Sequence, residues 1–148
     1  MDDDIDARGA ACRLSSRPLR RRLEAALLDS PVSRAGSHVA TLVGLAIGLP
    51  LSVGRVRVED GLIVCSGLPR WAFRRGGTCV GAVYLTRDAV TPAVLRHERV
   101  HVAQWRRYGL LFPALYWAAG IDATRNRFEI EAGLVDGGYI ADDCLPQP

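Results

Sequence analysis

The chain of 148 residues has the length of one domain, and its 49% hydrophobic and 24% charged residues are typical of a globular protein. Its net charge of +3, without a basic stripe interleaved with aromatic residues, argues against a nucleic-acid partner. All basic residues are arginines, which we interpret as a bias of the genome. The cysteines are too scattered for an iron–sulfur cluster or a cysteine-rich zinc knuckle; they are Cys12, Cys65, Cys79 and Cys144.

The N-terminal part is polar and charged. Residues 1–16 are predicted to form a flexible arm, followed by a single domain over residues 17–148. The acidic start lacks the basic region and apolar run of a signal peptide, so we expect a reducing, cytoplasmic location. A short helix is predicted from Pro18 to about Ser30. Its arginines, Arg20 to Arg22, are expected on a solvated face, with contact to acidic lipid as the alternative.

Residues 36–54 contain no Asp, Glu, Lys or Arg, and their number approaches that of a membrane span. Four glycines, Pro50 and several polar residues dilute the apolar character of this segment. We therefore predict a buried core helix. Flanking arginines leave membrane insertion, or peripheral contact of the helix with a membrane, as the alternative.

The middle of the chain has the alternating pattern of strands. Residues 55–69 predict a hairpin with its turn at Glu59, Asp60 and Gly61. Residues 78–88 predict a third strand. The expected fold is a small α+β domain with N-terminal helices, a three-stranded antiparallel sheet and C-terminal helices.

The C-terminal part reads as helices with clear boundaries. Thr91 as N-cap, Pro92 at the first helical position and Gly109 at the end delimit the longest of them. A second, apolar helix covers residues 110–121, too few to span a bilayer. A last helix is expected to begin at Asn126.

The long helix contains the pattern H-E-x-x-H at residues 97–101. At 100° per residue, His97, Glu98 and His101 share an arc about 100° wide with Val94 and Trp105. The arginines of the helix lie on the opposite side, so the arc should face inward. Two imidazoles and a carboxylate buried in one turn need partners, and a divalent metal such as Zn²⁺ supplies them.

Two histidines leave a catalytic zinc site incomplete, because such sites have three protein ligands and one open position. The only other histidine, His38, lies far upstream. A carboxylate downstream of the motif is therefore the more natural third ligand. Glu129 and Glu131 are both available, and they point about 200° apart on a helix. Periodicity does not choose between them, and Glu129 could instead form a capping box with Asn126.

The motif HERVH followed by NRFEIEAG resembles the gluzincin metallopeptidases, and among them, distantly, the CAAX prenyl protease and heat-shock membrane protease family. The resemblance implies a zincin-like domain whose C-terminal helices carry the active site. In it, His97, His101 and Glu129 would bind zinc and Glu98 would be the general base. The resemblance also implies hydrolysis of a peptide or protein substrate, which would add as an extended strand beside residues 83–85.

The sequence departs from that family at Gly133, where the family pattern has an aspartate; Asp136 is the candidate replacement. Three tyrosines, Tyr108, Tyr116 and Tyr139, are candidates for stabilising the oxyanion. The alternative function is a non-catalytic zinc-binding scaffold or interaction protein that keeps a relic of the site.

Overall fold

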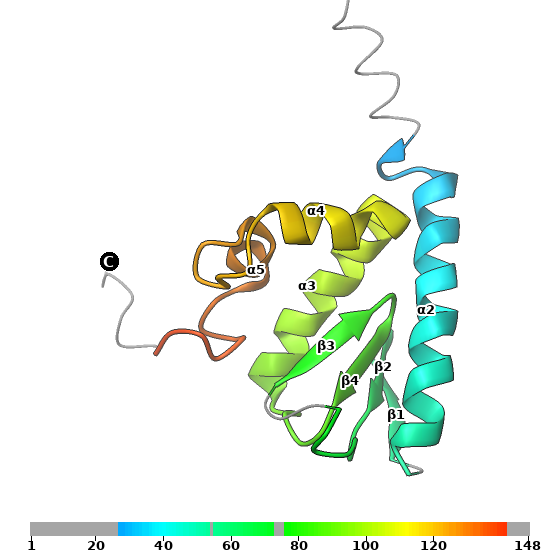
Figure 1. The fold of residues 1–148 in the computed structure, drawn as a ribbon, viewed down its shortest axis with the longest axis vertical. Coiled ribbons are helices and arrows are strands. Elements are labelled where there is room, and N and C mark those ends of the chain that lie inside the picture. The colour runs from blue at the N-terminus through cyan, green and yellow to red at the C-terminus, as the bar shows by residue number, and fades with distance from the viewer. Residues whose placement is uncertain (1–26, 54, 73–75, 142–148) are drawn as a thin grey trace, which may run out of the picture.

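The computed structural model describes residues 27–53, 55–72 and 76–141 (Figure 1). The predicted arm over residues 1–16 and most of the first predicted helix lie outside these residues. The described elements are α2 (Pro31–Leu51), β1 (Val56–Glu59), β2 (Leu62–Cys65), β3 (Gly77–Val80), β4 (Val83–Thr86), α3 (Pro92–Tyr108), a 3₁₀ turn η1 (Gly109–Leu111), α4 (Phe112–Ala118) and α5 (Arg127–Ala132). The mixed α+β class is confirmed.

The sheet differs from the prediction in strand number and direction. It has four strands in the order β1-β2-β4-β3, and the central pair, β2 and β4, is parallel. The β1–β2 hairpin is confirmed, with left-handed φ angles of 49° at Asp60 and 80° at Gly61 in its turn. The prediction of three antiparallel strands was wrong because residues 78–88 form two paired strands instead of one.

The turn between β3 and β4 depends on Gly81. Its φ of 64° lies in the left-handed region, and a Cβ there would lie 2.3 Å from the backbone nitrogen of Thr41 in α2. The apolar residues on both sides of this glycine read as one continuous strand in the sequence. Residues 83–85, which were expected to form the edge strand beside the substrate, belong to β4 and lie inside the sheet. The edge strand at this side of the sheet is β3.

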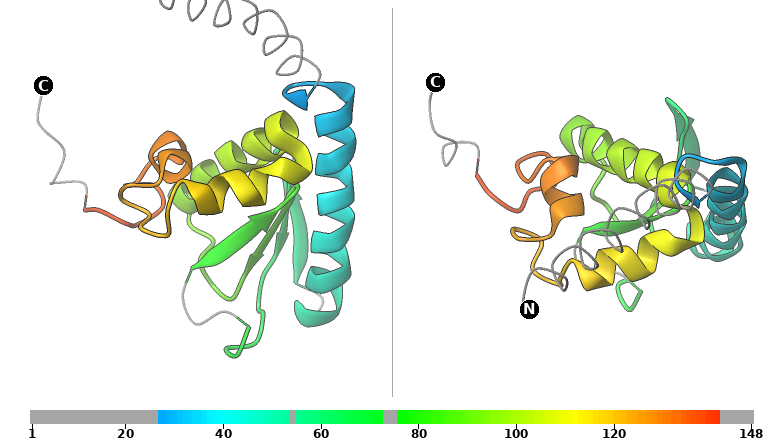
Figure 2. Two further views of the ribbon diagram at one scale, coloured as in Figure 1. Left: turned by 45° about the horizontal axis from the view of Figure 1, so that its top comes forward. Right: turned by 90° about the horizontal axis from the view of Figure 1, so that it is seen from above.

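Helices cover both faces of the sheet (Figures 1 and 2). On one face α2 packs over a core of Cys65, Leu68, Val83 and Leu85. On the other face α3 packs over Leu62, Val64 and Tyr84, with its own Leu95 and Val102. A third cluster joins α3 to α4 and α5 through Trp105, Phe112 and Phe128. The alternation of side chains along β2 and β4 thus supplies both cores.

The helix α2 is oriented with its small residues inward. Ser30 caps it through a capping box with Ser33. The buried positions along the helix are Ser33, Gly36, Ser37, Ala40, Gly44 and Gly48. Most of its large aliphatic residues are exposed instead, although Leu45 and Leu51 are half-buried against the sheet. The prediction of a buried core helix is therefore correct for one face only. By length and composition α2 could cross a membrane, a property shared by many core helices of soluble proteins.

Close approach of α2 to the sheet should make Gly44 intolerant of a side chain. A Cβ there would lie 2.8 Å from both the carbonyl oxygen of Val80 and the Cβ of Val83. We expect Gly44→Val to lower the free energy of unfolding by more than about 2 kcal/mol through overpacking. The matched change Ala46→Val lies on the exposed face and should alter it by less than about 0.5 kcal/mol. Equal denaturation midpoints for the two variants would contradict this packing.

Candidate metal centre

The helix α3 has the boundaries that the sequence predicts. Thr91 caps it by accepting a hydrogen bond from the backbone of Val94, Pro92 is its first residue, and Gly109 ends it with a φ of 57°. His97, Glu98 and His101 are all buried on the same side of the helix. The amphipathic pattern therefore orients the three polar side chains of the motif into the molecule.

The arginines of α3 lie away from this site. Arg106 and Arg107 are exposed in the last turn, where the helix dipole stabilises positive charge. Arg99 forms an ion pair of 2.7 Å with Asp60, which links α3 to the turn of the β1–β2 hairpin. Arg96 forms two hydrogen bonds, of 3.0 and 2.8 Å, with Asp136.

The short helix α5 brings Glu129 to the two histidines. Asn126 caps α5 through a hydrogen bond of 3.0 Å from the backbone of Phe128, and its amide group donates to the carbonyl oxygens of Tyr116 and Gly120. The carboxylate of Glu129 is buried and faces the imidazoles instead of the backbone of Asn126. The capping-box alternative for Glu129 was therefore wrong, although Asn126 is the N-cap as expected.

Three potential ligand atoms lie together in this cluster. The Nε2 atoms of His97 and His101 are 3.0 Å apart, and Glu129 oxygens lie 3.1 Å from the first and 3.5 Å from the second. Atoms bound at about 2.0–2.1 Å in tetrahedral geometry lie roughly 3.3 Å from one another. The three residues thus have the spacing of a tetrahedral metal site with one further position, and they could hold a metal ion.

The other nitrogen of each imidazole is held by an oxygen atom. Nδ1 of His97 lies 3.0 Å from the carbonyl oxygen of Gly133, and Nδ1 of His101 lies 2.7 Å from Oε1 of Gln104. Both oxygens can only accept, so each ring donates from Nδ1 and keeps the lone pair of Nε2 for a ligand. Both histidines therefore have the tautomer that metal binding needs.

Gln104 supports His101, a role that was not inferred from the sequence. Its Oε1 accepts from His101, while its amide group donates to the carbonyl oxygen of Phe128 and to Oε2 of Glu131, each at 3.0 Å. Glu131, the rival third ligand, thus binds Gln104 and lies outside the ligand cluster. The available signal was spacing, because a residue three positions after His101 shares its helix face.

The carboxyl group of Glu98 is buried beside the cluster, and its Oε2 atom has no hydrogen-bond partner. Burial raises the pKa of Glu98 to about 7, an effect that the neighbouring histidines oppose. Oε2 of Glu129 is likewise buried without a hydrogen-bond partner. Two orphaned carboxylate oxygens next to two imidazoles are expected where a cation and a water molecule bind.

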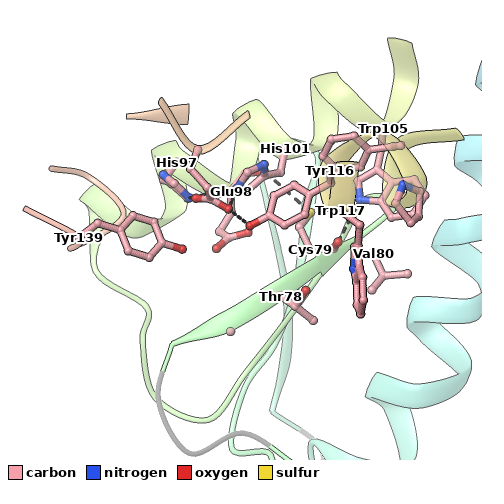
Figure 3. Close-up of a pocket in the computed structure, with 14 residues that line it drawn as sticks. Thr78, Cys79, Val80, His97, Glu98, His101, Trp105, Tyr116, Trp117 and Tyr139 are labelled. Atoms are coloured by element: carbon pink, nitrogen blue, oxygen red, sulfur yellow. Dashed lines mark hydrogen bonds and ion pairs between the residues drawn. The ribbon is translucent and has the colours of Figure 1, made fainter. Parts of the chain in front are cut away.

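Two of the three candidate tyrosines reach the site. Tyr116 donates a hydrogen bond to Oε1 of Glu129, and Figure 3 shows the hydroxyl groups of Tyr116 and Tyr139 pointing toward Glu98. Burial would raise the pKa of Glu129, but its close polar contacts with His101, His97 and the hydroxyl group of Tyr116 lower it. Tyr108 instead stacks on Phe112 and packs against Phe128.

A pocket of about 380 Å³ opens onto the cluster (Figure 3). One wall is β3, and Trp105 Nε1 donates a hydrogen bond of 2.9 Å to the carbonyl oxygen of Cys79 in this strand. The remaining lining is largely apolar and aromatic; it comprises Val80, Trp105, Phe112, Pro113, Tyr116, Trp117 and Tyr139. The cluster is therefore accessible from a cavity whose rim is an edge strand.

One sequence expectation around the site, the role of Asp136, is corrected. Asp136 pairs with Arg96, so it holds the segment after α5 against α3 and contacts neither imidazole directly. Gly133 contributes its carbonyl oxygen to His97, which replaces the contact expected from an aspartate side chain. His38 is exposed on α2 and takes no part in the cluster.

Comparisons of the chain with protein-family models, curated proteins and solved structures gave no match.

Glu129 and Glu131 provide a matched pair for testing the ligand set. Glu129→Ala removes a ligand atom and should weaken binding of Zn²⁺ by orders of magnitude, as should His97→Ala. Glu131→Ala removes only a partner of Gln104 and should have a much smaller effect. Competition titration with a chromophoric chelator measures the zinc affinity of each variant. Weak binding in the Glu131 variant alone would show that Glu131, and not Glu129, is the third ligand.

Gln104→Leu tests the support of His101. The substitution keeps the side-chain volume but removes the acceptor of the Nδ1 proton, so we expect metal affinity to fall by about 10–100-fold. The fold should persist, which circular dichroism can verify. An unchanged affinity would mean that the hydrogen bond does not orient the ligand.

Proposed function

We propose that the protein is a zinc-dependent metallopeptidase. The observation that carries this proposal is the position of the orphaned Glu98 oxygen, next to three converging ligand atoms and at the wall of an open pocket. A site with a purely structural role needs neither a carboxylate beside the ligands nor access from solvent. This combination favours hydrolysis over the alternative of a relic scaffold.

The donor set suits zinc among the divalent metals. His97, His101 and Glu129 offer two imidazole nitrogens and one carboxylate oxygen, which is a known ligand set of catalytic zinc. Zinc bound there would supply Lewis acidity, lowering the pKa of a water molecule to about 7 and polarising a carbonyl group. The pocket side of the cluster leaves space for this water and for the substrate.

Glu98 is the general base of the proposed reaction. Its free oxygen accepts a proton from the attacking water and then donates this proton to the amine that leaves when the peptide bond breaks. Because Glu98 directly follows His97 on α3, the helix fixes its position relative to this proposed ligand, while Glu98 itself is not one of the three. The hydroxyl group of Tyr139 is the candidate hydrogen-bond donor to the developing oxyanion, because Tyr116 already donates its only proton to Glu129.

The edge strand β3 is the proposed seat of the substrate backbone. The hydrogen bond from Trp105 shows that the carbonyl group of Cys79 points away from β4. In an antiparallel pair, residues alternate in direction, so the N–H group of Cys79 and both backbone groups of Gly77 also face this edge, whereas the Cys79 carbonyl group already accepts from Trp105. An extended peptide can therefore pair with β3 and carry its scissile bond past Glu98.

The substrate side chain next to the scissile bond is expected to be large and apolar. Trp105, Phe112 and Trp117 line the pocket. Among the described lining residues, charge is confined to the proposed metal and proton-transfer groups, so a charged substrate side chain would lose its water without gaining a partner.

Replacing Glu98 separates hydrolysis from metal binding. Glutamine is nearly isosteric and cannot accept the proton, so Glu98→Gln should keep zinc and the melting temperature but lose peptide hydrolysis. A library of quenched peptides, read alongside zinc content, measures both properties.

The same experiment identifies the alternatives. Loss of zinc in Glu98→Gln would make Glu98 a ligand and contradict its role as base. A wild-type protein that binds zinc but cleaves no peptide in the library would favour the non-catalytic scaffold.

A further inference from the structure

The outward face of α2 carries a series of exposed aliphatic side chains outside the candidate site. In Figures 1 and 2 the helix runs along one side of the molecule with its outer side uncovered by other described elements. The exposed large residues on and just after this helix are Val32, Val39, Leu42, Val43, Ile47, Leu49 and Val53. Leu42, opposite the glycine stripe, is 66% exposed. This helix exposes its large side chains and buries its small ones, the reverse of an ordinary surface helix.

The apolar surface continues beyond α2. Leu110 in η1 is 60% exposed and lies against Gly36, within one turn of Val32 and Val39. The neighbouring Leu111 is 46% exposed. Side chains from two elements therefore form one aliphatic surface, which we call the α2 face.

The composition of the α2 face favours lipid over a protein partner. The helix contains neither an aromatic residue nor methionine, the residues that are enriched in protein–protein interfaces. Its exposed side chains are valine, leucine and isoleucine, which match acyl chains. A self-complementary interface between two copies would lack aromatic anchors as well.

Charges at the ends of α2 complement an anionic membrane surface. The chain carries no charged residue between Arg34 and Arg55, and both of these arginines are exposed. They can reach lipid phosphates while the aliphatic residues between them enter the acyl region. Of the nearby carboxylates, Asp29 precedes the N-cap and Glu59 pairs with Arg57 and Arg99.

The packing of α2 determines its orientation on the bilayer. With 21 residues, about 31 Å in length, it matches the hydrocarbon thickness, but its inner face is packed on the sheet. A helix spanning the bilayer would carry the open edge of β1 and the ion pair of Arg57 with Glu59 into hydrocarbon, where unpaired backbone groups are not tolerated. The helix must therefore lie parallel to the membrane plane.

We propose that the α2 face docks the protein on the surface of a bilayer that contains anionic lipid, with α2 in the plane of the interface. The aliphatic side chains enter the boundary between headgroups and acyl chains, and the sheet and α3 remain on the aqueous side. This surface is independent of the proposed peptidase activity.

Flotation of the full chain with lipid vesicles tests the proposal. Wild-type protein should float with vesicles of phosphatidylcholine and phosphatidylglycerol, and less with phosphatidylcholine alone. The double variant Leu42→Ser/Leu49→Ser should lower the partition coefficient by about tenfold or more, because each leucine contributes substantial burial. The matched control Ile121→Ser replaces a residue that is 94% exposed on a different element and should float like wild type.

Charge variants test the second part of the proposal. Arg34→Gln/Arg55→Gln should reduce the preference for anionic vesicles, whereas Arg125→Gln, an exposed arginine in the loop before α5, should leave it unchanged. Unchanged melting temperatures of the variants would confirm that their folds are intact.

Four results would overturn the proposal. Wild-type protein that fails to float with either vesicle has no such surface. Equal binding by the leucine variant would place the contact elsewhere, for example at Arg20 to Arg22. A dimer in sedimentation that the leucine variant abolishes would make a second copy the occupant. Resistance to alkaline carbonate would indicate a spanning helix instead of a docked one.

Discussion

Burial of two imidazoles and two carboxylates within one small volume is the constraint on which the rest of the structure depends. His97, His101, Glu98 and Glu129 all lose their water, and such groups are stable in a protein only when they are paired or bind a cation. The protein partners satisfy both Nδ1 atoms but leave one oxygen of each carboxylate without a hydrogen bond. The fold thus fixes the orientation of these side chains, and His97, His101 and Glu129 together could hold a metal ion.

The surrounding elements can be understood as supports of this cluster. α3 is held on the sheet by its apolar side chains, and this fixes the direction in which both histidines point. α5 is held at its start by Asn126 and at Phe128 by Gln104, so Glu129 has little freedom to turn away. The same Gln104 orients His101, and one side chain therefore couples the two helices of the site. A substitution at this position would disturb both ligands.

The long helix and the identity of its inward residues could be predicted from the sequence, because caps and periodicity are local signals. Periodicity could not choose Glu129 over Glu131, and only the resemblance favoured Glu129. The structure separates them, because Glu129 faces the two histidines and Glu131 binds Gln104. The division of residues 78–88 into two strands depends on the contact of Gly81 with Thr41, which is distant in sequence. Similarly, hydropathy identified α2 as apolar, but which side it buries depends on how closely the glycines approach the sheet.

X-ray absorption spectroscopy of the zinc-loaded protein tests the central claim most directly, because it reports the atoms bound to the metal whether or not a substrate is known. Two imidazoles and oxygen ligands, all at about 2.0–2.2 Å and four-coordinate, are predicted for zinc held by His97, His101 and Glu129. The neighbouring Cys79 is a free thiol that lines the same pocket, so it is the alternative ligand that this measurement would detect. A sulfur ligand at about 2.3 Å, or a shell without imidazole, would contradict the assignment of this site.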